Sequence, residues 1–285
     1  MSPPEAQAVA LAAPRLFRAP AARPVPVRRR LGPGPAIPFA GAIGPLLILA
    51  VWSLSSVAGW ADPRLLPAPW RVVETAVQLI ESGRLQDNLA ISALRAAIGL
   101  SLGVVIGTVL ALIAGLNRLG DAVIDGPVQI KRAIPNLALV PLLMLWLGID
   151  EVMKITIITL AVVAPIYVHT HNGLRAIDQR YVELAQSLDL SQWRFIRDVV
   201  LPGALPGFLL GLRFAMTSAW LSLVVVEQIN AVSGIGYMID LARSHGQTRI
   251  ILVGIAVYAI LGLVSDLGVR LLQKRVLRWR RSLAE

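Results

Sequence analysis

The amino-acid sequence predicts an all-α membrane protein whose chain crosses the bilayer about six times. Hydrophobic residues make up 56% of the 285 residues and charged residues only 15%, which is typical of an integral membrane protein. Long apolar runs alternate with short polar stretches, and Arg residues gather where the runs end. The net charge of +10 is therefore better explained by membrane topology than by nucleic-acid binding. The absence of Cys excludes disulfides and thiolate metal sites.

The N-terminal residues 1–35 are rich in Pro, Ala and Arg and contain a single acidic residue, Glu5. Such a segment cannot bury a core, so it is predicted to be a disordered, basic cytoplasmic tail. The run Arg28–Arg30 is compatible with a twin-arginine export signal. However, the apolar run that follows is too long for a signal peptide, and no small-residue cleavage site comes after it. A cytoplasmic anchor before the first span is therefore the favoured interpretation.

Residues 36–86 are predicted to hold the first span and a periplasmic amphipathic segment. The span covers about 37–57, and about 20 residues at ~1.5 Å each are enough for the ~30 Å hydrocarbon core. Trp60 and Trp70 flank the next stretch, as expected at a membrane interface. A short amphipathic helix then runs to Ser82, with one apolar stripe made of Val73, Ala76, Val77 and Ile80.

Further spans are predicted at about 89–116, 133–149, 152–168, 203–226 and 250–272. The third span of the chain, 133–149, contains Pro135 and Pro141 and is expected to be kinked or broken. The stretch 117–132 before it is predicted to be a polar connector.

Two of these spans carry small residues at every fourth position. In the second span they are Gly99, Gly103, Gly107, Ala111 and Gly115, and in the fifth they are Gly203, Gly207, Gly211, Ala215 and Ala219. Small residues at this spacing let another helix approach closely. Both stripes are predicted to pack within the helix bundle or across a subunit interface.

The distribution of positive charge predicts the orientation. A chain with six spans has both termini on one side of the membrane, and most Arg and Lys residues fall on that side together with the loop 171–202. Since positive charge is concentrated in cytoplasmic loops, the termini and this loop are predicted to be cytoplasmic. Residues 272–285 would form a second basic cytoplasmic tail.

A polar stretch, Glu183–Pro202, lies between the fourth and fifth spans. Its apolar residues fit a helical repeat in two pieces, with a turn and a capping box expected at Asp189 and Gln192. Pro202 is expected to end the second piece. A bent amphipathic helix pair of this kind can dock into a groove of a soluble partner or lie on the lipid interface.

This stretch resembles the cytoplasmic loop of the permeases of binding-protein-dependent ABC importers. The family pattern is Glu-Ala-Ala, three residues, Gly, nine residues, Ile-x-Leu-Pro. Here Glu183, Ala185, Leu201 and Pro202 match it, Val199 stands in for Ile, and two positions depart from it: Leu184 replaces Ala and Asp189 replaces Gly. Asp is among the few residues that tolerate the positive φ that a Gly at such a position indicates.

The resemblance implies a type I importer permease-like bundle whose family domain covers about 87–271. It implies a coupling loop, in this chain Glu183, Ala185, Asp189, Leu190, Ser191, Leu201 and Pro202, docked on ABC ATPase subunits in the cytoplasm. The other implied partners are a periplasmic solute-binding protein and a second permease copy, which would form a homodimer with this chain. The implied location of the permease is the inner membrane. The sequence has no Gly-x-x-x-x-Gly-Lys-Ser/Thr loop, so ATP hydrolysis is expected from the partner and no cofactor is expected here.

The cargo implied by the resemblance is a small organic anion. Ile229–Gly236 and Leu137–Trp146 resemble the permeases of the aliphatic sulfonate, taurine and nitrate importers, and Ser233–Tyr237 with Tyr258–Asp266 favours the sulfonate branch. Taurine and nitrate remain alternatives. From other classes, a membrane-embedded enzyme would need converging catalytic polar residues, which the spans lack, and a scaffold or channel would need no ATPase.

Ionisable residues inside spans indicate function or pairing. Arg95 and Glu227 lie near the same end of their spans and are predicted either to form an ion pair or to help an anion pass. Arg213 is expected to snorkel toward the cytoplasm. Asp266 and Arg270 are expected to pair. His169 and His171 are two apart on a helix and would point away from each other, so no metal site is predicted.

Overall fold

The computed structural model describes residues 40–279. The predicted tail 1–35 and the end of the predicted tail 272–285 therefore lie outside the described residues. The chain divides into two compact units, residues 1–48 and 49–285, and the packing described below belongs to the second. Of the first unit the structure describes only the opening turns of α1 (Ala40–Val57), an apolar helix with Pro45 inside it.

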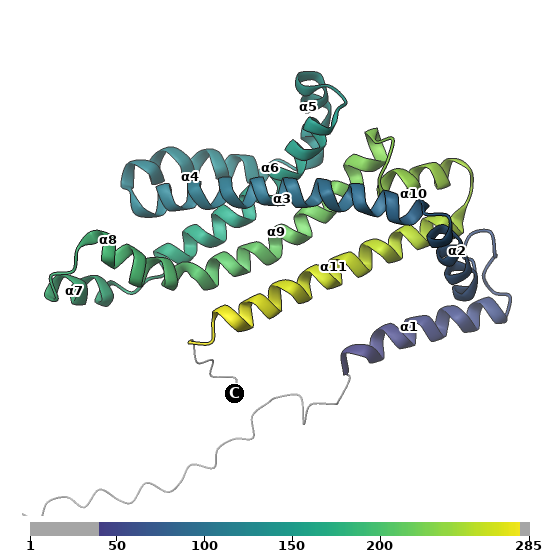
Figure 1. The fold of residues 1–285 in the computed structure, drawn as a ribbon, viewed down its shortest axis with the longest axis horizontal. Coiled ribbons are helices and arrows are strands. Elements are labelled where there is room, and N and C mark those ends of the chain that lie inside the picture. The colour runs from purple at the N-terminus through teal and green to yellow at the C-terminus, as the bar shows by residue number, and fades with distance from the viewer. Residues whose placement is uncertain (1–39, 280–285) are drawn as a thin grey trace, which may run out of the picture. The chain divides into compact units, whose positions relative to one another are not determined.

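Every secondary-structure element within residues 40–279 is helical, which confirms the predicted fold class (Figure 1). After α1 the elements follow in this order: α2 (Pro69–Glu81), α3 (Arg84–Leu116), α4 (Arg118–Ala133), η1 (Asn136–Leu139), α5 (Val140–Leu147), α6 (Glu151–Arg175), α7 (Gln179–Ser187), α8 (Gln192–Phe195), η2 (Ile196–Val200), α9 (Leu201–Asn230), α10 (Ile235–Ser244) and α11 (Thr248–Val276).

Four described helices are long and apolar enough to cross a membrane: Arg84–Leu116, Glu151–Arg175, Gln192–Ile229 and Thr248–Val276. A fifth crossing exists if α4 and residues 136–147 form one broken span, bent by 93°. The first predicted span is represented by the shorter apolar helix Ala42–Val57, and residues 37–39 lie outside the described part. The helices that fit a spanning role are thus four or five in the described part, against about six expected from the sequence.

The break predicted in the third span is present, but the elements on either side of it differ from the prediction. The stretch 117–132 is helix α4 rather than a polar connector, and residues 133–149 do not form one spanning helix. The chain breaks at Ile134, which has extended backbone angles (φ −86°, ψ 120°). Because Pro135 follows, its ring disfavours the α conformation at Ile134 and ends the helix there.

Helix α6 is the centre of the bundle, and it packs against α3 through one small-residue stripe and against α9 through the other. A Cβ atom added at Gly103 would lie 2.5 Å from Val162 Cβ, and one added at Gly207 would lie 2.5 Å from the backbone oxygen of His169. Both stripes therefore permit close helix packing inside one chain, as predicted. The interior between the three helices is filled by the buried side chains Ile158, Val162, Ile166, Ala215, Ala219 and Leu223.

Helix α10, which the sequence analysis did not identify, packs with α2 and α11 at the end of α3 and α9. Its residues Ile235, Met238 and Ile239 are buried against Val72 and Leu79 of α2. The inward face of α2 is thus set by Val72 and Leu79. Most of the predicted stripe, namely Val73, Val77 and Ile80, is exposed on a different face.

Candidate functional site

The segment 183–202 comprises the second half of the short helix α7, a tight turn, and α8, which is the first turn of a longer helix. Asp178 caps α7, because its carboxylate accepts a hydrogen bond from the Arg180 N–H at 2.9 Å. α7 ends at Ser187, and α8 begins at Gln192. The bent helix pair predicted from the sequence is therefore present.

The turn between the helices depends on Asp189, whose φ is +50°. The Leu190 N–H donates to the Ala185 carbonyl at 3.0 Å, and the Asp189 N–H donates to the Gln186 carbonyl at 3.1 Å. This pair of bonds is the Schellman pattern, which uses one left-handed residue to satisfy the last carbonyls of a helix. The geometry explains why the family pattern has Gly here, and Asp occupies it at some cost in backbone strain.

The capping box predicted at Asp189 and Gln192 is wrong. The residue that precedes α8 in capping position is Ser191, and its side chain makes no capping hydrogen bond. Asp189 cannot cap α8 because it already forms the left-handed corner at the end of α7.

Pro202 does not end a helix, contrary to the prediction. The chain is helical from Gln192 to Ile229, with a π-helical turn over Ile196–Val200. Pro202 has no N–H to donate and its ring would clash with the Asp198 carbonyl in a regular α-helix. The extra residue in the π turn removes this clash, and the Leu201 N–H donates to the Ile196 carbonyl instead. The segment is thus joined rigidly to α9.

The two faces of the helix pair differ in burial. Ala185 is buried, and Val200 packs with Leu174 at the end of α6. The opposite face exposes Glu183, Leu184, Leu188 and Trp193.

Most of the predicted coupling residues in the turn and at the start of α9 are also accessible. Leu190 is half-buried, and Asp189, Ser191 and Leu201 are exposed. An exposed surface that combines a carboxylate with large apolar side chains suits contact with another protein.

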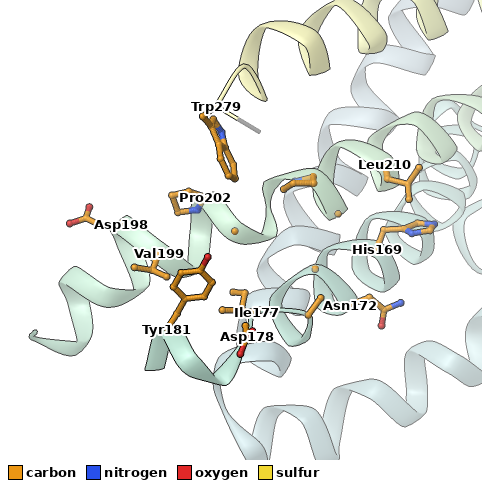
Figure 2. A pocket seen from close by; sticks show the side chains of 15 residues that line it. His169, Asn172, Ile177, Asp178, Tyr181, Asp198, Val199, Pro202, Leu210 and Trp279 are labelled. Atoms are coloured by element: carbon orange, nitrogen blue, oxygen red, sulfur yellow. The ribbon is translucent and has the colours of Figure 1, made fainter. Parts of the chain in front are cut away.

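An open pocket of about 1060 Å³ lies beside the helix pair (Figure 2). Its walls come from the end of α6, from α7 and from the start of α9, and Trp279 after α11 closes one side. Tyr181 and Pro202 line it together with two carboxylates, Asp178 and Asp198. A smaller pocket of about 360 Å³ lies between α7 and α8, lined by Ala185 and Leu190 among others.

At the other end of α9, Arg95 of α3 contacts Glu227. The ion pair predicted from the sequence for these two residues is therefore present. Arg95 Nη1 donates to Glu227 Oε1 at 2.8 Å, and to the Ser233 carbonyl at 2.6 Å. Its Nε and Nη2 donate to the two oxygens of Glu151, each at 2.6 Å. Lys154 Nζ also donates to Glu151, at 2.8 Å. We refer to Arg95, Glu151, Lys154 and Glu227 as the Arg95 cluster.

Glu227 is the most enclosed member of the Arg95 cluster. Its carboxylate accepts hydrogen bonds from Ser92 Oγ at 2.8 Å, from the Gly236 N–H at 2.9 Å and from Tyr258 OH at 3.1 Å. A Cβ atom at Gly234 would lie 2.4 Å from this carboxylate, and Gly234 has a φ of +115°. Only Gly fits both requirements, because it has no Cβ and adopts positive φ freely.

Sequence reasoning missed Glu151 and Lys154 as members of this cluster. The available signal was the presence of two charged residues in the first turn of an apolar span. Their contact with Arg95 depends on the parallel packing of α3 and α6, which nothing local in the sequence specifies.

Two smaller polar groups also change the sequence interpretation. Arg213 forms an ion pair with Asp266, which also pairs with Arg270 at 2.7 Å. The expected snorkelling of Arg213 toward the cytoplasm stays a prediction. The predicted pairing of Asp266 with Arg270 is confirmed.

His169 stacks on Phe214, whereas His171 Nε2 lies 3.0 Å from Asp121 Oδ1. Asp121, Asp125 and His171 place one candidate metal-ligand atom each within 4.8 Å of one another. Arg175 also lies 3.4 Å from Asp121.

The sequence profile of the family described as the binding-protein-dependent transport system inner membrane component matches residues 103–278. The chain belongs to this family. It is 46% identical over 235 residues to SsuC of Escherichia coli (strain K12), named for aliphatic sulfonate transport, covering 82% of this chain and 89% of that one. It is 34% identical over 244 residues to the taurine transport system permease TauC of the same organism, covering 84% and 89% of the two chains.

A solved chain of an amino acid ABC transporter with histidines shares the fold. The TM-score is 0.59 at 17% identity, and the match covers 71% of this chain and 96% of that chain. This protein is therefore an inner-membrane permease subunit of an ABC importer, and its relatives are permeases rather than enzymes. In this permease the segment that resembles the family's Glu-Ala-Ala loop forms the bent pair α7–α8, and the π turn accommodates Pro202 at its end.

Proposed function

We propose that this permease forms the translocation pore for a small organic anion, most closely an aliphatic sulfonate, with a second copy of the same chain. The 46% identity to the Escherichia coli SsuC over most of both chains supports this cargo class. Taurine, itself an aminosulfonate, is the second candidate, since the TauC relative is 34% identical. A periplasmic solute-binding protein would deliver the cargo on the side opposite the α7–α8 pair.

The coupling of ATP hydrolysis to transport is assigned to residues 183–202. The observation that carries the proposal is the exposed face of the bent pair, with Glu183, Leu184 and Trp193 directed outward at one end of a membrane bundle. An ABC ATPase subunit would grip this face from the cytoplasm, with both termini of the permease on the same side. Because α8, η2 and α9 form one continuous helix of 38 residues, Gln192–Ile229, a displacement of the loop would move α9 as a rigid body.

The cargo is tested by growth and uptake. A host that lacks its own sulfonate and taurine importers receives the permease together with an ABC ATPase subunit and a periplasmic solute-binding protein cloned from the same source genome. Ethanesulfonate, taurine and nitrate are then supplied one at a time as the sole source of sulfur or nitrogen. Uptake of ethanesulfonate is expected. Uptake of taurine or nitrate alone would move the cargo to that class, and accumulation of none would overturn the proposal.

The orientation and the ATPase contact are tested with single cysteines, which the chain permits because it has none of its own. Ser191→Cys lies between α7 and α8, and Ser82→Cys lies at the end of α2 and serves as the control. In intact cells a membrane-impermeant maleimide is expected to label Ser82→Cys only. A bifunctional crosslinker is expected to join Ser191→Cys to the ATPase. External labelling of Ser191→Cys would place the loop outside and refute the coupling role.

A further inference from the structure

We propose that the Arg95 cluster is an anion-exchange site of the transport path, in which the carboxylate of Glu151 is a replaceable counterion for Arg95 and Lys154. The ligand class is a monovalent oxyanion such as the sulfonate group. The inference deepens the proposed function and rests on it, since it identifies where within this chain an anionic cargo is held.

The members of the cluster differ sharply in exposure. The side chains of Arg95 and Lys154 are each 4% exposed and that of Glu227 is 0% exposed, whereas that of Glu151 is 53% exposed. Glu151 stands at the first residue of α6, where the helix begins after the Gly148–Asp150 turn. Three charges are thus enclosed, and the fourth reaches the surface and can leave without unfolding a helix.

The charge balance requires an anion at the position of Glu151. Arg95 and Glu227 neutralise each other at 2.8 Å. Within the described residues 40–279, Glu151 is the acidic residue that Lys154 contacts. If Glu151 swung away alone, a buried cluster would hold two cations and one carboxylate, which is strongly unfavourable in a poorly solvated site. A monovalent anion that took its place would restore neutrality.

The geometry around Glu151 matches an oxyanion. The Nε and Nη2 atoms of Arg95 donate in parallel to its two oxygens at 2.6 Å, which is the bidentate fork that guanidinium offers to carboxylates and to other flat or tetrahedral oxyanions. Lys154 Nζ supplies a third donor at 2.8 Å. Ser233 Oγ lies 3.3 Å from Arg95 Nη2 and borders the same position. A sulfonate has three oxygens, one more than the carboxylate that now occupies this place.

Glu227 cannot be the exchangeable partner. Its carboxylate is held by Ser92, Tyr258 and the Gly236 N–H as well as by Arg95, and Gly234 packs directly on it. Arg95 therefore has a fixed side that faces Glu227 and an exchangeable side that faces Glu151. The fixed contact keeps the guanidinium in position while the other side changes partner.

Exchange of partners makes passage of an anion less costly than entry into a neutral apolar site. A lone anion that enters the membrane interior loses its hydration without compensation. Here an arriving sulfonate would gain the contacts that Glu151 gives up, while the released carboxylate regains water at the surface. The cluster would thus discriminate in favour of monovalent oxyanions that can accept a bidentate fork.

The first experiment measures binding of ethanesulfonate to the purified full-length chain in lipid nanodiscs by titration calorimetry. Glu151→Gln removes the competing charge, and we expect it to bind ethanesulfonate about tenfold more tightly than the unsubstituted chain. Glu74→Gln is the matched control, since Glu74 pairs with an exposed Arg71 on α2 at 3.0 Å. It raises the net charge equally and is expected to leave binding unchanged. Lys154→Gln is expected to weaken binding about tenfold.

Equal affinities of Glu151→Gln and the unsubstituted chain for ethanesulfonate would overturn the proposal. Equally tighter binding by Glu74→Gln would also overturn it, because it would show nonspecific attraction of the anion to positive charge. A second measurement needs no variant and so remains decisive if Glu151→Gln does not fold. Carbodiimide labelling of Glu151, read by mass spectrometry, is expected to rise several-fold with ethanesulfonate and to stay constant with neutral ethanesulfonamide. Constant labelling with both compounds would refute the exchange.

The outcomes separate this inference from the proposed function. If cells take up ethanesulfonate but neither binding nor labelling changes as expected, the site is wrong and the cargo stands. If cells take up only nitrate, the titration is repeated with nitrate, and the same variants decide the site.

Discussion

The two ends of helix α9 are built on opposite principles. At its C-terminal end, Glu227 is fully enclosed, and its carboxylate accepts hydrogen bonds from α3, α10 and α11. At its N-terminal end, the helix continues into α8 and carries the α7–α8 pair, whose large side chains Leu188 and Trp193 are exposed. At the C-terminal end the polar groups are therefore satisfied by residues of the same chain. The N-terminal end instead presents an exposed surface suited to binding a partner protein.

The difference separates residues that hold the permease together from residues that would act on another protein. Substitution of Arg95 or Glu227, enclosed members of the Arg95 cluster, should change the stability of the isolated chain, because their charges are buried and compensate each other. Substitution on the exposed face of α7–α8 should change transport while stability stays nearly constant. The following predictions test that separation, from the largest expected loss of stability to the smallest.

Arg95→Met should destabilise the isolated chain most. It leaves the Glu227 carboxylate buried without its cation, and breaking a buried pair in this way costs about 3–5 kcal/mol. Thermal unfolding of the purified protein in detergent measures the effect. The double variant Arg95→Met, Glu227→Gln should recover part of the loss, since no unpaired charge remains. Additive losses would show that the two residues do not act as a pair.

Gly103→Leu should destabilise the chain by a smaller amount. A Cβ atom at this position meets Val162 Cβ at 2.5 Å, so the larger side chain must push α3 away from α6. Overpacking of a close interface typically costs about 1–3 kcal/mol. Gly262→Leu in α11 is the control, because no atom lies within 4 Å of the added Cβ there. If both variants unfold at the same temperature as the parent, the small-residue stripe does not set the packing.

Asp189→Gly and Asp189→Ile should act in opposite directions at the corner of the coupling segment. Asp189 has a φ of +50°, which costs an L residue roughly 1–2 kcal/mol and costs Gly almost nothing. Gly is therefore expected to raise the unfolding temperature slightly and to preserve transport, while Ile is expected to lower both. Amide hydrogen exchange of Leu190, which donates to Ala185, reports whether the corner forms. Identical exchange in all three proteins would contradict the role of this residue.

Local signals in the sequence were sufficient for part of this picture. The positive φ of Asp189 followed from its place in the family pattern, and the close approach on α6 followed from the four-residue spacing of Gly. The break before α5 followed from Pro135. Each of these depends on one residue type whose backbone preference or size acts wherever the chain places it.

The remaining features depend on contacts between distant segments. Glu151 joins Arg95 across 56 positions, and Ser233 joins it across 138, so no window of sequence shows the cluster. Helix α4 was hidden because Gly126 and Pro127 interrupt its apolar pattern. Helix α10 carries a local signal, because its buried residues follow helical spacing: Ile235, Met238, Ile239 and Ala242. However, periodicity alone does not distinguish a helix from a strand over only ten residues.

Glu183→Gln should leave stability within about 0.5 kcal/mol of the parent, because the side chain is exposed and outside the core. If the carboxylate contacts the ATPase, uptake should nevertheless fall at least several-fold. Among the variants proposed here, Glu183→Gln would then show the largest loss of transport relative to its loss of stability. Glu81→Gln, another exposed Glu, located at the end of α2, is the matched control and should change neither. A variant with parent-like uptake would show that the coupling surface does not depend on this carboxylate, and Trp193→Ala would then test its apolar part.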